Sequence, residues 1–352
     1  MAYRIGFIGV GAIAKQHVFA LKALPYYYEN TPKIKLVAAA SLNAASSQNF
    51  ASLYGFEKST NVASLLQDEE INTLFILSPN HVHYEHLMQA LNCPHITNIY
   101  IEKPLGIPEA KFPLLDQKLQ NRADLNIQVG FQFLFMPTVM KAYALKNELG
   151  KLIHFHARYL HSNYLAKSYR DKRQHRLLPA PMGGAMADLG SHALSLLTAF
   201  LGNDLNIEYA TSSGLFPDVN ANSDLFSQVF IRDLASNAIG TCVASRISSG
   251  AKDVLELEIR GTDGALELST LYPDILRFCK GHDGVWNEIF CGNDYQPCSS
   301  FPSCNVPSGW LRSLIHALYV FFTESKNKVT PTLQHGLAVE KLLNKTAALL
   351  IK

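Results

Sequence analysis

The stretch Gly6–His17 reads GFIGVGAIAKQH, and it decides the fold expected for the N-terminal part of the chain. Its residues 9–14, GVGAIA, follow a G-x-G-x-x-A spacing. The apolar run Arg4–Ile8 before the glycines predicts a strand, and Ala12–Leu24 after them predicts a helix that Pro25 ends. A glycine pattern between a first strand and a first helix is typical of a phosphate-binding turn.

Each small residue of this turn has its own physical reason. Gly9 permits the tight change of direction, and Gly11 lets the backbone approach an anion without a Cβ in the way. Ala14 lets the helix pack closely on the strand. Free N–H groups and the dipole at a helix N-terminus favour a pyrophosphate. The sequence therefore predicts a dinucleotide site, with Gly9, Gly11, Ala12, Ile13 and Ala14 as phosphate contacts.

Short apolar runs alternate with helical patterns through the first 130 residues. Continuous apolar strands that alternate with helices are typical of a parallel sheet covered on both faces. We therefore expect residues 1–130 to form a doubly wound Rossmann domain. The further predicted strands are Ile34–Ala40, Asn72–Leu77, Asn98–Ile101 and Asn126–Phe131.

The pattern changes after residue 130. Helical patterns at Thr138–Glu148 and Ala185–Leu201 precede a series of strand-like runs, and helices at Trp310–Glu324 and Gln334–Leu350 close the chain. In Leu255–Arg260, apolar and charged residues alternate, which is typical of an antiparallel strand with one wet face. We expect residues 131–352 to form an α+β domain with a large, mainly antiparallel sheet. The predicted strands are Ile207–Ser212, Leu225–Ile231, Ala238–Ser245, Val254–Ile259, Ala265–Ser269 and Ile275–Cys279.

Composition excludes several classes of protein. The 352 residues carry 31 Lys and Arg against 29 Asp and Glu, a net charge of +2 that gives no global field for nucleic acid or an anionic membrane. No apolar run approaches the ~20 residues of a membrane span. None of the six cysteines forms a C-x-x-C pair, so we predict no metal site and expect free thiols in the cytoplasm. A disulfide within 279–304 is the alternative if the protein is exported.

The second predicted strand bears on the choice of cofactor. Val37–Asn43 reads VAAASLN, without the acidic residue that usually binds the adenosine ribose. Without a carboxylate at Ser41, nothing repels a 2′-phosphate, although no arginine follows to bind one. The sequence predicts NAD(P) with a slight preference for NADP, contacted by Ser41 and Leu42.

Four motifs together resemble the Gfo/Idh/MocA family of NAD(P)-dependent oxidoreductases, which act largely on sugars and polyols. Leu257–Leu268, LEIRGTDGALEL, also resembles the family's sheet hairpin, so the resemblance runs from the first strand to about residue 270. The four motifs are GFIGVGAIAKQH, Ser78-Pro79-Asn80 with His83 behind it, IEKPLG at Ile101–Gly106, and GGAMADLGSH at Gly183–His192.

The resemblance implies a catalytic set of Lys103, Asp188 and His192. A histidine can take a hydroxyl proton near neutral pH while a hydride leaves the carbon, so His192 is the predicted general acid/base. Asp188, four residues earlier on the predicted helix, shares its face and orients the ring or a substrate hydroxyl. Lys103 follows a strand's carboxyl end and polarises the reacting oxygen. Lys103 as the proton donor is an open alternative.

The resemblance also implies further site residues around the cofactor. We expect a cis peptide bond before Pro104, and His83 either beneath the nicotinamide or in a structural role. The family often has an Arg within 129–137 and an acid at Ser195, and both are missing here. The remaining predicted cofactor contacts are Ser78, Pro79, Asn80, His83, Glu102 and Lys103, and the predicted substrate contacts are Gln132, Tyr164, Arg170 and Arg173.

The two arginines belong to a basic segment, residues 167–176, with five Lys or Arg and a single acid, Asp171. It predicts either a lid that binds a carboxylate or phosphate group, or a solvated loop or oligomer contact.

The implied function is hydride transfer between NAD(P) and a hydroxyl or ketone carbon of a sugar, a polyol or a sugar derivative. The family's antiparallel sheets pack face to face, so we expect a homodimer or homotetramer. One alternative is a non-catalytic NAD(P)-sensing regulator, which needs no proton-transfer set. Another is an NAD-dependent glycosidase that oxidises transiently and consumes no net cofactor. The last is a subunit whose sheet serves assembly only.

Overall fold

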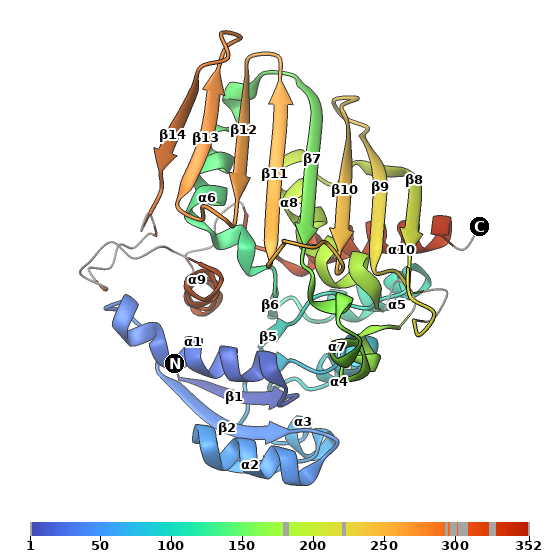
Figure 1. Cartoon of the computed structure of the whole chain (residues 1–352). Coiled ribbons are helices and arrows are strands. Elements are labelled where there is room, and N and C mark those ends of the chain that lie inside the picture. The colour runs from blue at the N-terminus through green and yellow to red at the C-terminus, as the bar shows by residue number, and fades with distance from the viewer. Residues whose placement is uncertain are drawn as a thin grey trace. The chain divides into compact units, whose positions relative to one another are not determined.

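The structure is a computed structural model that describes residues 2–178, 183–219, 223–292, 295, 301, 309–323 and 329–350. These residues form two compact units, and Figure 1 labels those of their elements for which there is room. The first unit draws on residues within 1–132, 297–303 and 311–333, and the second on residues within 133–296, 304–310 and 334–352.

A six-stranded parallel sheet in the order β3-β2-β1-β4-β5-β6 organises the first unit. After β1, the chain adds β2 and β3 on one side of it. It then crosses back and adds β4, β5 and β6 on the other side. Such a switch leaves a crevice for ligands beyond the carboxyl ends of the central strands. The predicted doubly wound sheet is confirmed. Its strands are β1 (Tyr3–Ile8), β2 (Ile34–Ala40), β3 (Lys58–Thr60), β4 (Thr73–Ile76), β5 (Asn98–Ile101) and β6 (Asn126–Val129).

The first helix differs from its prediction at the C-terminal end. Pro25 lies inside α1, which continues to Tyr27. A proline in the last turn removes only its own N–H, and the backbone N–H of Tyr28 still donates to the carbonyl of Leu24 at 3.0 Å. The helices of this unit are α1 (Ala12–Tyr27), α2 (Ala44–Tyr54), α3 (Val62–Leu66), α4 (His83–Ala90), α5 (Phe112–Gln120) and α9 (Trp310–Phe322).

Helix α9 comes late in the sequence but packs within the first unit. The amide of Gln128 donates to the Ala317 carbonyl at 2.9 Å, and the hydroxyl of Tyr3 donates to that of Phe322 at 2.7 Å. The ring of Tyr28 stacks on that of Tyr319 at 3.9 Å. The sequence-based division at residue 130 stays a prediction of two functional domains, and the structural units differ from it in the placement of α9.

An eight-stranded sheet in the order β14-β13-β12-β11-β7-β10-β9-β8 organises the second unit. All its neighbouring strands are antiparallel except β7 and β10, so the predicted mainly antiparallel sheet is confirmed. The strands are β7 (Leu152–Leu160), β8 (Leu205–Ser213), β9 (Phe226–Asp233), β10 (Ile239–Ser245), β11 (Val254–Gly261), β12 (Gly264–Ser269), β13 (Ile275–Lys280) and β14 (Trp286–Phe290).

Strand β7 lies in the middle of this sheet, yet the sequence analysis did not predict it. Phe155, Ala157 and Tyr159 are buried, whereas His156 and Arg158 are exposed on the opposite face. The three polar side chains in LIHFHARYL, two histidines and an arginine, hide the strand signal. The sheet also carries α8 on its buried face, against β7, β10 and β11. The helices of this unit are α6 (Pro137–Leu145), α7 (Lys167–Asp171), α8 (Ser191–Leu201) and α10 (Leu333–Leu350).

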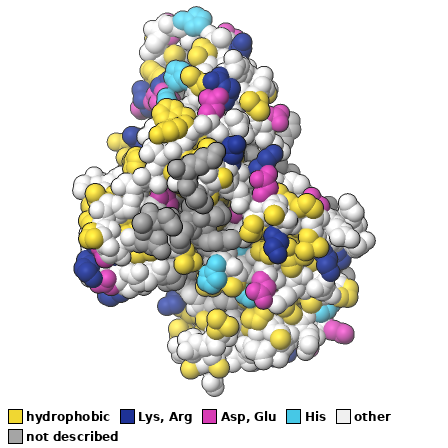
Figure 2. Space-filling model, turned by 90° about the vertical axis from the view of Figure 1, so that its right-hand side faces the viewer, with side chains coloured by type: hydrophobic (Ala, Val, Ile, Leu, Met, Phe, Trp, Pro, Cys, Tyr) yellow, Lys and Arg dark blue, Asp and Glu magenta, His cyan; other side chains and the backbone are white. Residues whose placement is uncertain are grey.

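The surface charges and the described cysteines agree with the expectations of balanced charge and free thiols. On the face drawn in Figure 2, acidic and basic side chains of the described residues are interspersed. Within the described part of the chain, no helix is both long and apolar enough to cross a membrane. Cys93, Cys242, Cys279 and Cys291 form no disulfide, and Cys298 and Cys304 lie outside the described residues.

Candidate active site

The phosphate turn has the geometry that its glycines predict. Gly9 adopts a φ of 107°, and a Cβ there would lie 2.4 Å from the carbonyl oxygen of Leu77. Gly11 is the N-cap of α1, and a Cβ at Gly11 would meet nothing within 4 Å. The first turn of α1 has no acidic residue and no side-chain cap. Gly9 is therefore needed by the backbone, whereas Gly11 keeps open space beside a helix N-terminus that suits an anion.

The end of β2 uses its polar side chains locally. The hydroxyl of Ser41 donates to the carbonyl of Asn43 at 2.7 Å. The side chain of Asn43 in turn accepts the backbone N–H of Ser46 at 2.9 Å and caps α2. Leu42 between them is fully exposed. The Ser41 oxygen keeps lone pairs that can accept a hydrogen bond.

His83 links two of the predicted cofactor segments in the first unit. Its Nε2 lies 2.6 Å from the carbonyl oxygen of Ser78 and its Nδ1 lies 2.8 Å from that of Pro104. Its side chain is completely buried, and this burial lowers its pKa, although the two carbonyl acceptors act in the opposite sense. Of the two expected roles, these contacts fit the structural one. His83 ties the Ser78 turn to the segment that carries Lys103.

Lys103 follows the carboxyl end of β5, and the Lys103–Pro104 peptide bond is cis, as expected. The preceding Glu102 is buried. One of its oxygens lies 2.8 Å from Nε2 of His17, and the other accepts the backbone N–H of Lys103 at 3.3 Å. A Cβ at Gly130 would lie 2.9 Å from this carboxylate. Sequence reasoning missed His17 and Gly130 as its neighbours.

The predicted helix Ala185–Leu201 is wrong in its first turns. Met186–Gly190 form a π-helical segment, and α8 begins only at Ser191. The buried Asp224 receives the backbone N–H of Met186 at 2.8 Å on its side chain and that of Ala185 on its carbonyl. Because a π-helical turn is wider than an α-helical one, the four-residue spacing of Asp188 and His192 no longer implies a shared α-helical face.

The carboxylate of Asp188 contacts two arginines. Nη2 of Arg246 lies 2.9 Å from its Oδ2, and Nη1 of Arg176 lies 3.4 Å from the same oxygen. The guanidinium of Arg246 also donates to the carbonyl of Arg176 at 2.7 Å and lies 4.6 Å from the ring centroid of Tyr164. Sequence reasoning missed Arg246, which stands alone after a predicted strand without any motif.

His192 lies buried in the first turn of α8. Its ring meets that of Phe133 edge-on at 4.9 Å and lies 5.7 Å from that of Tyr159. One turn later, the hydroxyl of Ser195 lies 2.8 Å from Nε2 of His335. Burial lowers the pKa of His335 to about 4. At the position where the family often has an acid, this chain therefore has a serine bonded to a neutral histidine.

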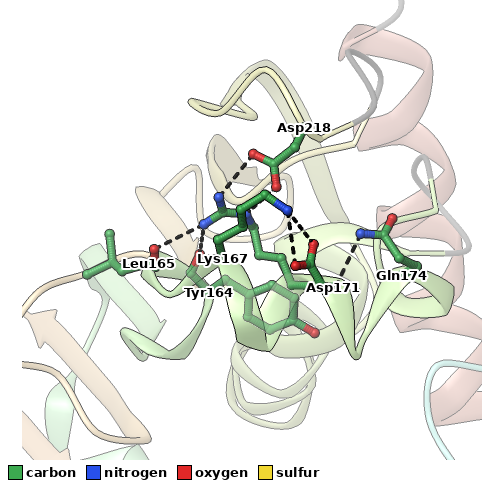
Figure 3. Close-up of polar contacts among 7 residues, drawn as sticks. Tyr164, Leu165, Lys167, Asp171, Gln174 and Asp218 are labelled. Atoms are coloured by element: carbon green, nitrogen blue, oxygen red, sulfur yellow. Dashed lines mark hydrogen bonds and ion pairs between the residues drawn. The ribbon is translucent and has the colours of Figure 1, made fainter.

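The basic segment makes polar contacts both within itself and to residues outside it (Figure 3). The guanidinium of Arg170 bonds both carboxylate oxygens of Asp218, at 2.8 and 3.0 Å, and donates to the carbonyls of Tyr164 and Leu165. It also lies 3.9 Å from the ring centroid of Phe216.

Two further predicted substrate contacts, Tyr164 just before this segment and Arg173 within it, differ in exposure. Tyr164 is buried in an apolar cluster with Leu177 and Leu225, whereas Arg173 is partly exposed beside the ring of Tyr169.

The predicted site residues divide between the two units. The phosphate turn, Ser41, Leu42, the Ser78–His83 turn, Glu102, Lys103 and Gln132 belong to the first unit. Tyr164, Arg170, Arg173, Asp188 and His192 belong to the second. Within the first unit, the structure brings Ser78, His83 and Pro104 together. Within the second, it brings Tyr164 and Asp188 together around Arg246.

Two family models match most of the chain. The model of the oxidoreductase family with an NAD-binding Rossmann fold matches residues 3–129. The model of the GFO/IDH/MocA C-terminal domain matches residues 139–267.

Individual relatives are distant. The chain is 24% identical to glucose-6-phosphate 3-dehydrogenase of Bacillus subtilis, over 66% of this chain and 62% of that protein. It is also 24% identical to levoglucosan dehydrogenase of Pseudarthrobacter phenanthrenivorans, over 74% of this chain and 72% of that protein. A levoglucosan dehydrogenase structure in complex with NADH and L-sorbose superposes with a TM-score of 0.82 at 21% identity, covering 99% of this chain and 98% of the other.

Proposed function

Because the chain belongs to the Gfo/Idh/MocA family of oxidoreductases, we propose that it is an NAD(P)-dependent dehydrogenase acting on a CH–OH group of a sugar, a polyol or a sugar derivative. The observation that carries the proposal is the phosphate turn. The open position at Gly11 beside the uncapped N-terminus of α1 suits the pyrophosphate of a dinucleotide. The two named relatives are sugar dehydrogenases by their names, which supports the substrate class.

The cofactor would be held by the residues around this turn. We assign its pyrophosphate to Gly9, Gly11 and the first residues of α1, its ribose to Ser41 and Leu42, and its nicotinamide half to the turn Ser78–Asn80. When bound, NAD(P) supplies the hydride acceptor. The absence of an acid at Ser41 leaves room for a 2′-phosphate, so we keep the slight preference for NADP as part of the proposal.

We assign the proton chemistry to His192, Lys103 and Asp188. An imidazole can accept the hydroxyl proton as the C–H bond breaks and return it in the reverse reaction. The buried aromatic rings of Phe133 and Tyr159 hold the His192 ring in place. Lys103 polarises the reacting oxygen with its charge. Asp188 carries a fixed negative charge that orients the imidazole or a neighbouring hydroxyl. Lys103 as the proton donor is the variant to test.

On the substrate side we propose Gln132 and the partly exposed Arg173 as direct contacts. Tyr164 and Arg170 were predicted in the same role, but the apolar cluster around Tyr164 and the hydrogen bonds of the Arg170 guanidinium to Asp218 and to two carbonyls favour a supporting part. Arg170 holds the segment that carries Arg173, so an anionic group on the substrate would meet Arg173 first. We therefore keep the hypothesis that residues 167–176 form a lid, with Arg173 as the side chain that binds the anionic group.

We further propose that the protein is a cytoplasmic homodimer or homotetramer. The sheet face opposite α8 is a candidate contact surface, because it is hollowed by about 890 Å³ and lined by the ion pairs Arg158–Glu256 and Arg277–Glu267. Light scattering that finds only monomer would contradict this part.

The test of the function is a fluorescence titration with NADH and NADPH, followed by a screen of polyols and sugars for cofactor reduction. We expect saturable binding of at least one nucleotide and turnover that Lys103→Met and His192→Ala abolish. Binding without turnover would favour the regulator, and substrate conversion without net cofactor reduction would favour the glycosidase. Folded protein that binds neither nucleotide would refute the proposal.

A further inference from the structure

The side chain of Arg246 is one of the largest fully buried side chains in the described part of the chain, with an exposed fraction of 1%. A guanidinium does not deprotonate in proteins, so this side chain carries a positive charge into the interior of the second unit. A buried charge needs a partner of opposite sign. The carboxylate at hydrogen-bond distance from Arg246 is Asp188, at 2.9 Å.

Both the backbone and the side chain of Arg246 make contacts that fix the position of this guanidinium. Arg246 directly follows β10, where its backbone N–H donates to Leu225 at 2.8 Å and its carbonyl accepts from Tyr164 at 3.1 Å. Its side chain donates to the carbonyl of Arg176 and lies against the ring of Tyr164. The guanidinium therefore has contacts of its own besides the one to Asp188.

Asp188 itself lies in a less regular setting. It belongs to the π-helical segment, and its side chain is 13% exposed. Segments of this kind are frequent at functional sites because they depart from the regular helical ladder. A carboxylate there has rotational freedom that a charge-assisted hydrogen bond removes.

We propose that Arg246 is a positioning residue of the active site, which holds the Asp188 carboxylate in one orientation. The inference rests on the proposed function, because Asp188 has its role there. A site residue held by a second layer of hydrogen bonds keeps its geometry, and misplacement by about 1 Å can cost ~100-fold in rate.

The test uses Arg246→Met, Asp188→Asn and the double variant in the polyol assay. We expect Arg246→Met to lower kcat by up to ~100-fold while the Kd for NADH or NADPH stays unchanged. Because Arg246 acts through Asp188, the two effects should not add, and the double variant should be about as slow as Asp188→Asn alone. Fully additive losses would overturn the proposal.

Chemical rescue separates positioning from folding. Arg246→Ala should regain activity on addition of guanidinium ion, at concentrations far below those that unfold proteins, while urea should have no effect. Arg246→Lys keeps the positive charge but loses the planar set of N–H donors of a guanidinium. Its activity should therefore lie between those of the wild type and Arg246→Met.

The matched control is Arg122→Met in the first unit. Like Arg246, Arg122 bonds both backbone carbonyls, those of Leu91 and Cys93, and a carboxylate, that of Asp124. We expect this variant to lose stability and keep the wild-type kcat at a temperature where it is folded.

The outcomes distinguish the two proposals. If the wild type turns over a polyol and folded Arg246→Met or Arg246→Lys matches its kcat, the positioning role is refuted and the function stands. If guanidinium fails to rescue a folded Arg246→Ala, the positioning role is also refuted. If the wild type binds no nicotinamide nucleotide and oxidises no polyol, the proposed function fails, and the role of Arg246 fails with it.

Discussion

Nε2 of His17 lies 2.8 Å from Oε1 of Glu102, and both side chains are buried. His17 belongs to α1, the helix that follows the phosphate turn, and Glu102 directly precedes Lys103. The ring of His17 also meets Phe75 and Tyr100 edge-on at 5.5 and 5.0 Å. One buried contact therefore joins the helix of the predicted cofactor turn to the backbone of the predicted catalytic lysine.

Replacing His17 by alanine should destabilise the first unit strongly. Glu102 would keep its burial and its bond to the Lys103 N–H but lose the His17 ring, and removing one partner of a buried hydrogen bond to a carboxylate costs about 3 kcal/mol of unfolding free energy. Urea denaturation would measure the loss. Lys35→Ala is the control, because it removes a surface ion pair with Glu57 in which both side chains are about half exposed, and should change stability by less than about 0.5 kcal/mol. Equal losses in both variants would contradict the argument.

Two glycine substitutions should separate folding from binding. In Gly9→Ala the new Cβ would clash with the Leu77 carbonyl at a φ of 107°, so stability should fall. In Gly11→Ala the Cβ enters open space, so stability should be unchanged while the Kd for the nucleotide rises. Thermal unfolding and fluorescence titration measure the two effects. Unchanged nucleotide affinity in Gly11→Ala would remove Gly11 from the proposed site.

Much of the first unit could be predicted because its signals are local. The phosphate turn, the apolar strands and the Ser78 and Lys103 segments each lie within a few consecutive residues. The contacts that connect them could not be predicted in the same way. His17 and Glu102 are far apart in sequence, and only the completed sheet brings them together. The same holds for α9, whose partner Gln128 lies in β6.

The second unit was harder to predict for two physical reasons. Strand β7 carries polar residues on a face that the sheet leaves open, so its apolar alternation is weak. The π-helical segment depends on Asp224, which comes from a distant loop and binds the backbone of Met186. The motif around Asp188 predicts this carboxylate as a site residue, and that role stays a prediction. Its partner Arg246 gives no signal in sequence, because a lone arginine is usually exposed.

Acid should weaken the fold through His335. Burial lowers its pKa from 6.5 to about 4, so as the pH falls the unfolded chain takes up this proton before the folded one. The contribution of His335 is fully present above pH 6.5 and is lost progressively down to about pH 4, by about 3 kcal/mol in total. Urea denaturation across this pH range would show it, and His335→Gln should remove that part of the slope. The same slope in both proteins would contradict the assignment.

Arg170 should matter more for stability than for substrate affinity. Its guanidinium is bonded to Asp218 and to two carbonyls, so Arg170→Met leaves these acceptors without a charged donor and should cost about 2 kcal/mol. Arg173→Met, by contrast, removes a partly exposed side chain and should leave stability within about 0.5 kcal/mol. If the lid hypothesis is correct, Arg173→Met raises KM for a phosphorylated or carboxylated sugar. An unchanged KM in folded Arg173→Met would refute that role.

The substitution Ser41→Asp, directly after β2, should change the preferred cofactor from NADPH to NADH. A carboxylate in Ser41→Asp would accept hydrogen bonds from the adenosine ribose hydroxyls of NADH. The same carboxylate would repel the 2′-phosphate of NADPH, because like charges in close contact cost several kcal/mol, which corresponds to about a 100-fold rise in Kd. Parallel titrations of the wild type and Ser41→Asp would measure both changes.

Ser46→Asp is the control for this substitution, because it places a carboxylate nearby in the chain, on an exposed residue in the first turn of α2. It should change the ratio of the two Kd values less than Ser41→Asp does. If Ser41→Asp leaves the ratio unchanged while the protein still binds NADH, the ribose does not lie at Ser41. The absence of an acid there would then carry no information about the cofactor.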